Sequence, residues 1–195
     1  MEALSILDNQ YWSTRYQTGQ TGWDIGMVST PLAAYIDQLS NTNLHILIPG
    51  CGRAYEAWYL LQKGFKNITL LDISETLTRQ LKNDFAATPV QVLQGDFFEH
   101  TGTYDLILEQ TFFCALPPQL RPDYVQHIHK RLRKGGKLVG ILFNRYFDQS
   151  PPFGGSRQEY SALFGPHFKI ITLAPCYNSI EPRSGTELFI NFRKD

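Results

Sequence analysis

The sequence predicts an α/β fold built on a mostly parallel β-sheet, with a nucleoside site at one edge of that sheet. Short apolar runs alternate with helical patterns along the chain. The first run, 44–49, stops at a turn containing Gly50 and Gly52, and a helical pattern follows it. The second run, 67–72, ends on the carboxylate of Asp72 about 20 residues after the glycines, which is how α/β sheets bind a nucleoside.

Length and composition are those of one globular domain. The chain has 195 residues, of which 43% are hydrophobic and 18% are charged, and this supplies one full core. We find no internal repeat, low-complexity tract or linker. The sequence therefore predicts a single domain over 1–195, in which 1–42 form an N-terminal lid segment and a helix, and 43–195 form the α/β core.

Charge and cysteine usage narrow the function classes. The formal net charge is +0 at pH 7, which argues against nucleic acid or an anionic membrane as partner and leaves a small-molecule substrate. Cys51, Cys114 and Cys176 are widely spaced and never form C-x-x-C, so we expect no disulfide framework, no metal site and a reducing cytoplasm. The chain opens without a basic n-region, and no apolar run nears the ~18 residues of a membrane helix.

The N-terminal segment, 1–28, is rich in aromatic residues. Trp12 and Tyr16 would share one face of a helix, and glycines end that helix before Trp23. Two interpretations stay open for this segment. It either pins itself to the core, or it forms a lid whose aromatic faces cover a bound ligand.

The other elements follow from periodicity, caps and chain breakers. Thr30 as N-cap and Pro31 at the first helical position start a helix whose apolar face includes Leu39. Gly64 ends a helix over 54–63, and Ser74 caps the next one. We further predict strands at 90–93, 104–108, 137–143, 168–174 and 187–193, a helix from 117 through Leu132 that ends at 133–136, and a short helix near 159–164.

The last two strands should pair antiparallel. Their connection, 176–186, is too short for a crossover helix of useful length. The prediction is therefore a seven-stranded mixed sheet with an antiparallel last strand.

Three kinds of nucleoside site compete for the glycine turn. A P-loop needs G-x-x-x-x-G-K-[ST], which this sequence does not contain. A dinucleotide site needs a third glycine where Tyr55 stands, and a substrate domain that the chain has no room for. S-adenosylmethionine-dependent methyltransferases use such a turn with one acid after the second strand and another after the third. Asp96 stands at that second position, where it would take the adenine amino group, and Phe97 would cover the ring.

Motifs along nearly the whole chain point to one family. They are Trp12, Gly19-x-Thr21-x-Trp23-Asp24-x-Gly26, Pro31-Leu32, Pro49-Gly50-Cys51-Gly52, Leu71-Asp72-Ile73-Ser74 and Asp105-Leu106-Ile107 with Phe112-Phe113-Cys114-Ala115. Together they resemble the thiopurine S-methyltransferase superfamily, and within it the plant methyl halide and thiol methyltransferase branch. The resemblance implies a Rossmann-like class I S-adenosylmethionine-dependent methyltransferase with an N-terminal lid.

The resemblance also implies the cofactor site. S-adenosyl-L-methionine would be the cofactor and S-adenosyl-L-homocysteine the product, and the implied contacts are Trp12, Tyr16, Trp23, Gly50, Asp72, Asp96, Phe97 and Gln110. To these we add their neighbours in the same motifs as predicted cofactor-binding residues: Cys51, Gly52, Ile73 and Glu109. Two positions depart from the plant pattern. Tyr16 replaces a second tryptophan and keeps an aromatic face. Gln110 replaces a tyrosine, which changes the methyl-transfer pocket and so bears on the choice of acceptor.

The favoured acceptors are small soft nucleophiles: a thiol, bisulfide, a halide or thiocyanate. Such nucleophiles need no strong general base, since a thiol of pKa about 8.5 is already partly thiolate at neutral pH. The sequence accordingly shows no obvious catalytic dyad. By their positions after strands and in late loops, we expect the acceptor to lie among Phe112, Phe113, Tyr146, Phe153, Tyr177 and Arg183, with Arg183 holding an anion and Tyr177 donating a hydrogen bond.

Three rival functions remain at this stage. An O- or N-methyltransferase of a small metabolite would need a base near the methyl group, which Glu109 or a histidine would have to provide. Glu109 is otherwise a cap or a contact to the cofactor's amino group. The other rivals are a nicotinamide-dependent reductase and a non-catalytic S-adenosylmethionine-binding module.

Overall fold

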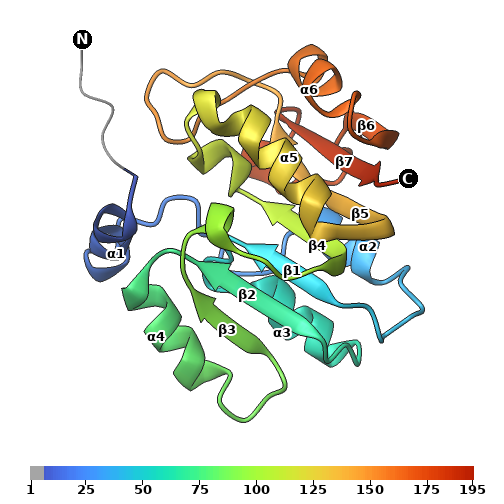
Figure 1. Cartoon of the computed structure of the whole chain (residues 1–195). Coiled ribbons are helices and arrows are strands. Elements are labelled where there is room, and N and C mark those ends of the chain that lie inside the picture. The colour runs from blue at the N-terminus through green and yellow to red at the C-terminus, as the bar shows by residue number, and fades with distance from the viewer. Residues whose placement is uncertain (1–6) are drawn as a thin grey trace.

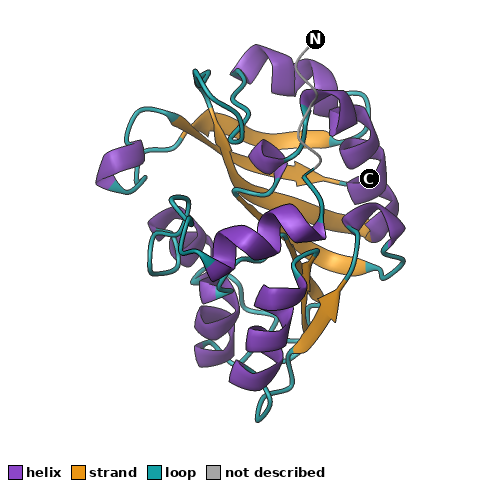
Figure 2. Cartoon of the chain, turned by 90° about the vertical axis from the view of Figure 1, so that its left-hand side faces the viewer, coloured by secondary structure: helices purple, strands orange, loops and turns teal. Residues whose placement is uncertain are grey.

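The computed structural model describes residues 7–195, so the first six residues of the predicted lid segment lie outside it. The chain forms a seven-stranded sheet in the order β3-β2-β1-β4-β5-β7-β6, with helices on both faces (Figures 1 and 2). β7 runs antiparallel to both of its neighbours, and the other strands share one direction. The predicted mixed sheet with its closing antiparallel strand is confirmed.

The elements lie close to the predicted ranges. The strands are β1 (Ile46–Pro49), β2 (Ile68–Asp72), β3 (Gln91–Gln94), β4 (Tyr104–Gln110), β5 (Leu132–Phe143), β6 (Lys169–Pro175) and β7 (Glu187–Arg193). The helices are α1 (Asn9–Gln17), α2 (Thr30–Ile36), α3 (Tyr55–Gln62), α4 (Glu75–Asp84), α5 (Arg121–Arg131) and α6 (Arg157–Phe164).

Apolar side chains fill two layers, one on each face of the sheet. On one face, α2, α3 and α4 cover the sheet with side chains such as Ile36, Leu60 and Leu81. On the other face, α5 and α6 contribute Tyr124 and Phe164. Because the central strands are covered on both sides, their side chains are apolar in both directions, as is typical of buried parallel strands.

The boundary between α5 and β5 differs from the prediction. The sequence places Leu132 inside the helix and the strand after 133–136, but the helix ends at Arg131 and the strand begins at Leu132. Leu132 pairs with Tyr104 across a local irregularity in the β4–β5 ladder. The glycine stretch also bonds to the C-terminal residues, since Lys194 N–H donates to the Gly136 carbonyl at 2.9 Å. These long-range partners draw the predicted helix end into the sheet.

The start and end of α2 differ as well. Ser29 takes the N-cap position in place of Thr30, whose hydroxyl instead donates to the backbone carbonyl of Asn178. The helix ends at Ile36, so Leu39 lies in the following turn, where it still packs against the core.

The strand order reverses between β1 and β4, and this reversal positions the site. In an open α/β sheet, a crevice forms at the carboxyl ends of the strands on either side of such a switch point. α1 lies just beyond these ends, at the left of Figure 1. It docks on the start of α4, since the hydroxyls of Ser13 and Ser74 are 2.9 Å apart and Asn9 Oδ1 accepts from Glu75 N–H at 2.8 Å.

Between Leu7 and Asp195, none of the helices combines the length and the apolar character needed to cross a bilayer.

The two-layer core leads to a stability prediction. Ile190 on β7 is fully buried, whereas Ile171 on β6 is 47% exposed. Ile190→Ala should lower the free energy of unfolding by about 2–5 kcal/mol. It deletes apolar groups whose burial stabilises the fold, and it leaves a cavity in the core. Ile171→Ala, the matched control, should change it by about 0.5 kcal/mol or less. Urea unfolding measures both values, and equal losses would contradict the assigned burial.

Candidate active site

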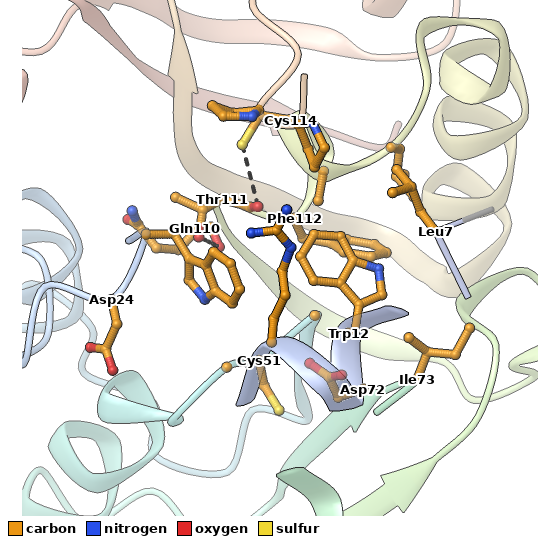
Figure 3. A pocket seen from close by; sticks show the side chains of 18 of the residues that line it. Leu7, Trp12, Asp24, Cys51, Asp72, Ile73, Gln110, Thr111, Phe112 and Cys114 are labelled. Atoms are coloured by element: carbon orange, nitrogen blue, oxygen red, sulfur yellow. Dashed lines mark hydrogen bonds between the residues drawn. The ribbon is translucent and has the colours of Figure 1, made fainter. Parts of the chain in front are cut away.

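A cavity of about 770 Å³ lies at the carboxyl ends of the strands around the switch point. Its size is within the ~300–1,000 Å³ typical of small-molecule sites. Figure 3 shows Cys51, Asp72 and Ile73 on one side of it, and Thr111, Phe112 and Cys114 on the facing side. Of the predicted cofactor residues, the structure brings together Trp12, Tyr16, Trp23, Gly50, Cys51, Gly52, Asp72, Ile73, Asp96, Phe97 and Gln110 along this cavity.

The glycine turn after β1 allows a close approach of two strand ends. Gly50 has φ +55°, and a Cβ atom there would lie 2.3 Å from Cδ2 of Phe112. Gly52 has φ +51°. Only glycine adopts this left-handed region at little cost and leaves room for the ring of Phe112.

Asp72 ends β2 as a buried carboxylate at the cavity wall. Its Oδ1 accepts a hydrogen bond from Ser74 N–H at 2.9 Å. Burial raises its pKa to about 6, and backbone N–H groups of Ser74, Gly52 and Ile73 limit the rise. A buried acid with polar partners on one side and a cavity on the other is suited to accept hydrogen bonds from a polar ligand.

Three aromatic side chains of the N-terminal segment meet over the glycine turn. The ring of Trp23 lies edge-on to Trp12, with centroids 5.4 Å apart, and edge-on to Tyr16 at 5.7 Å. Burial, with the nearby charge of Asp72, raises the pKa of Tyr16. We call Trp12, Tyr16 and Trp23 the aromatic trio. The trio forms one wall of the cavity as a single packed unit.

The end of β3 forms the next part of the wall. Asp96 caps the short 3-10 turn Phe97–Glu99, and its Oδ1 accepts from Phe98 N–H at 2.8 Å. Phe97 packs edge-on against Phe112, with centroids 5.1 Å apart. No heavy atom lies within 4 Å of a Cβ built on Gly95, so the space beside this turn is open.

Glu109 departs from the predicted cofactor set. It is fully buried and does not line the cavity. Its Oε1 accepts from the N–H groups of Phe112 and Phe113, each at 2.8 Å, and its Oε2 accepts from the Tyr124 hydroxyl at 2.6 Å. Burial raises its pKa to about 7. The carboxyl therefore caps the turn after β4, which is one of the three roles that the sequence left open for it.

The predicted acceptor residues divide into two groups. Phe112 and Arg183 line the cavity, and an Arg183 guanidinium N–H donates to the Trp23 carbonyl at 2.8 Å. The other four do not line it: Phe113, Tyr146, Phe153 and Tyr177.

Each of these four has a physical reason for its place. Phe113 is a core residue packed on Tyr124. Tyr146 and Tyr177 are 71% and 93% exposed, so their side chains point to solvent. The loop that carries Phe153 is tied to the chain by a hydrogen bond from its N–H to the Cys114 carbonyl at 2.6 Å.

Sequence reasoning missed several lining residues. Cys114, Phe143, Arg145, Phe147 and Thr186 line the part of the cavity beyond β4 and β5. Arg145 and Phe147 directly follow a predicted strand, which was the available signal. Glu56, a buried acid whose pKa burial raises to about 7, also lines the cavity from the first turn of α3. Residues 7–195 contain no group of three or more His, Cys, Asp or Glu side chains placed to hold a metal ion.

Comparisons with known proteins agree with this geometry. The family described as Thiopurine S-methyltransferase (TPMT) matches residues 7–188. Probable thiol methyltransferase 2 of Arabidopsis thaliana is 31% identical over 193 residues, covering 94% of this chain and 84% of that protein. Thiocyanate methyltransferase 1 of Brassica oleracea is 26% identical over 192 residues, with the same two coverages of 94% and 84%.

A solved structure shows the fold. The Burkholderia thailandensis 1,6-didemethyltoxoflavin-N1-methyltransferase, with bound 1,6-didemethyltoxoflavin and S-adenosylhomocysteine, superposes with a TM-score of 0.77 at 19% identity. The match covers 95% of this chain and 86% of that one. The Rossmann-like class I methyltransferase fold predicted from the sequence is thereby confirmed.

The contact between Gly50 and Phe112 leads to a second prediction. Gly50→Ala should lower the free energy of unfolding by at least about 1–2 kcal/mol, because a side chain in the left-handed region is strained and the new Cβ displaces Phe112. Gly95→Ala is the matched control, since it lines the same cavity in open space, and it should cost about 0.5 kcal/mol or less. Urea unfolding compares them, and a Gly50→Ala protein as stable as the control would refute the proposed steric role.

Proposed function

The chain belongs to the thiopurine S-methyltransferase family and is an S-adenosylmethionine-dependent methyltransferase of a small molecule, and from this premise we propose its acceptor. The acceptor is a small soft nucleophile: a thiol, bisulfide, thiocyanate or a halide. The relatives named above as thiol and thiocyanate methyltransferases support this class. The three free, buried cysteines support a reducing, cytoplasmic setting.

The residues at the ends of β1–β3 fit the nucleoside part of the cofactor. Buried Asp72 has an oxygen available for ribose hydroxyls, and the open space beside Gly95 leads to Asp96 and Phe97. In this proposal Asp96 accepts from the adenine amino group and Phe97 packs on the ring. S-adenosylmethionine supplies a methyl group carried on a cationic sulfur.

The aromatic trio provides faces for that cation. Aromatic rings attract a sulfonium through their quadrupole without offering an anion that the methyl group could alkylate. The trio also excludes water from the cavity, which protects an in-line displacement from competing hydrolysis. Trp12, Tyr16 and Trp23 would therefore act as a lid over the reacting atoms.

One observation carries the choice of acceptor. Among residues 7–195, the acceptor side of the cavity, which is lined by Phe112, Phe143, Arg145, Phe147 and Arg183 from β5 and the loops after β4, β5 and β6, carries no histidine or carboxylate of its own. None of the histidines among residues 7–195 lines the cavity. The carboxylates that line it come from the N-terminal segment and from the elements around β1–β3: Asp8, Asp24, Glu56, Asp72 and Asp96. Glu109, the nearest acid on β4, is enclosed behind the turn by its own hydrogen bonds.

The same side carries positive charge and apolar rings. Arg183 and Arg145 both line it, beside Phe112, Phe143 and Phe147. Arg183 is paired with the buried carboxylate of Glu187 at 3.6 Å, so the net positive charge of this side comes from Arg145. A cationic, apolar pocket binds a weakly hydrated anion well, because desolvation of a soft anion costs less than that of a hard one. An alcohol or amine must lose a proton during transfer, and within residues 7–195 this side of the cavity carries no histidine or carboxylate to take it.

The function is tested by turnover with a panel of acceptors. The panel holds iodide, bisulfide, thiocyanate, an aromatic thiol and a thiopurine, with phenol and an amine as controls, and the readout is S-adenosylhomocysteine formation. We expect turnover confined to the sulfur and halide members. Efficient methylation of phenol or the amine alone would contradict the proposal, because those acceptors need a base.

The role of Asp72 predicts how cofactor affinity depends on pH. The carboxylate is the form that accepts two hydroxyl hydrogen bonds, and its pKa is raised to about 6. Below that value the group is protonated, so the affinity for S-adenosylhomocysteine should fall by about tenfold between pH 7 and pH 5. Calorimetry across this range measures the change.

Two variants control this experiment. Asp72→Asn should bind more weakly at every pH and lose the dependence. Glu56→Gln, which removes the other buried acid at the cavity, should keep the dependence. A profile that survives in Asp72→Asn would assign the titration to another group.

A further inference from the structure

We infer that the Gln110 carboxamide, oriented by Ser29, donates the hydrogen bond that binds and aligns the anionic acceptor. The inference rests on the proposed function, because it names the group that selects the acceptor within that site. It assigns Gln110 to the acceptor and not to the cofactor, and it makes Ser29 a positioning residue.

Gln110 lies where the nucleoside part of the cavity, at the ends of β1–β3, meets the acceptor part, beyond β4 and β5. It is the last residue of β4, next to β1 at the switch point, and it lines the cavity. Thr111 follows it with φ +59°, a left-handed conformation that is uncommon for a residue with a side chain. Such strain is typical of functional sites, where the surrounding structure holds it in place. The strand therefore turns sharply just after Gln110.

The oxygen end of the Gln110 carboxamide meets a buried hydroxyl. Ser29, only 3% exposed, donates from Oγ to Gln110 Oε1 at 2.9 Å. Ser29 is itself held at the start of α2, where its N–H group bonds the carboxylate of Glu56. Because the oxygen is engaged, the amide nitrogen is turned away from Ser29. Within residues 7–195 this nitrogen donates to no side chain or backbone group.

Three other neutral donors that line the cavity near Gln110 and Arg183 are already used within the described chain. The Thr111 hydroxyl donates to the Gln110 carbonyl at 2.7 Å, and the Cys114 thiol donates to the Thr111 carbonyl at 3.3 Å, the contact dashed in Figure 3. The Thr186 hydroxyl donates to the Arg183 carbonyl at 2.8 Å. Burial raises the pKa of Cys114 to about 12, so it stays a neutral thiol.

The carboxamide is chemically suited to this task. Its N–H groups hydrogen-bond an anion but neither give up nor take a proton at neutral pH. In the step itself, a lone pair of the acceptor anion forms a new bond to the methyl carbon. The carbon–sulfur bond of the sulfonium breaks, and its electron pair stays on sulfur. Anion and cation become two neutral products, so no proton moves and no base is needed.

This chemistry predicts a split between KM and kcat. The hydrogen bond is strongest to the full charge of the bound anion and weakens as that charge is consumed. Removing it should therefore raise the acceptor KM and change kcat little. Loss of a donor that served only the cofactor would instead weaken binding of S-adenosylhomocysteine.

The experiment uses thiocyanate as probe and Gln110→Glu as the main variant. Glutamate keeps the size and shape of Gln110 but replaces the donor with a negative charge. Thiocyanate KM should rise more than tenfold, while the Kd of S-adenosylhomocysteine should change by about twofold or less. Gln91→Glu, the same change at the exposed start of β3, is the matched control and should alter neither value.

Ser29→Ala tests the positioning role. It frees the carboxamide to rotate, so thiocyanate KM should rise several-fold with kcat and the unfolding midpoint unchanged. A structural role alone would instead lower the unfolding midpoint and leave KM as it was.

Binding to the protein–S-adenosylhomocysteine complex separates failure of the inference from failure of the proposed function. Calorimetry should detect thiocyanate binding to this complex and its loss in Gln110→Glu. Gln110-dependent binding without any turnover would support the inference and overturn the proposed function. An unchanged thiocyanate KM in Gln110→Glu, or a change confined to S-adenosylhomocysteine affinity, would overturn the inference.

Discussion

The cavity depends on one buried carboxyl group behind it. Glu109 is enclosed by protein, yet each of its oxygens has a donor: two backbone N–H groups of the following turn and the hydroxyl of Tyr124 on α5. Burying a carboxyl group without hydrogen-bond partners would cost free energy of folding. The turn therefore has to adopt the conformation that points its N–H groups at Glu109. In this conformation the turn places the ring of Phe112 against Gly50. The contact joins the ends of β4 and β1.

The opposite wall is held in a different way. The N-terminal segment reaches the core through polar contacts: Ser13 to Ser74, Asn9 to the start of α4, and Asp24 to Arg53 at 2.8 Å. Hydrogen bonds and partly exposed ion pairs of this kind contribute about 1 kcal/mol each or less. The N-terminal segment also packs Tyr16 and Val28 against the apolar layer of α2–α4. One wall of the site is thus set by core packing, and the other is held by polar contacts together with the packing of these two side chains.

Much of this could be predicted from the sequence, because the informative signals are local. Apolar periodicity, Gly64 and Ser74 predict the elements, and Gly50, Asp72 and Asp96 predict which strand ends line the cavity. What failed depends on long-range contacts. The α5–β5 boundary is set by pairing with Tyr104, and the outward orientation of Tyr146 and Tyr177 is set by loops whose course no local pattern encodes.

The alternation of β4 explains why this strand presents a hydrogen-bond donor, and not an acid, to the cavity. Successive residues of a strand point to opposite faces, so Glu109 turns to Tyr124 of α5 and Gln110 turns to Ser29 of α2. A slip of one residue would exchange the two and place an acid where the carboxamide stands. The register is protected against that slip, since Leu106 and Leu108 must face the α2–α4 layer while Ile107 faces the α5–α6 layer. Core packing on both faces of the sheet therefore decides which of two adjacent, similarly shaped side chains meets the acceptor.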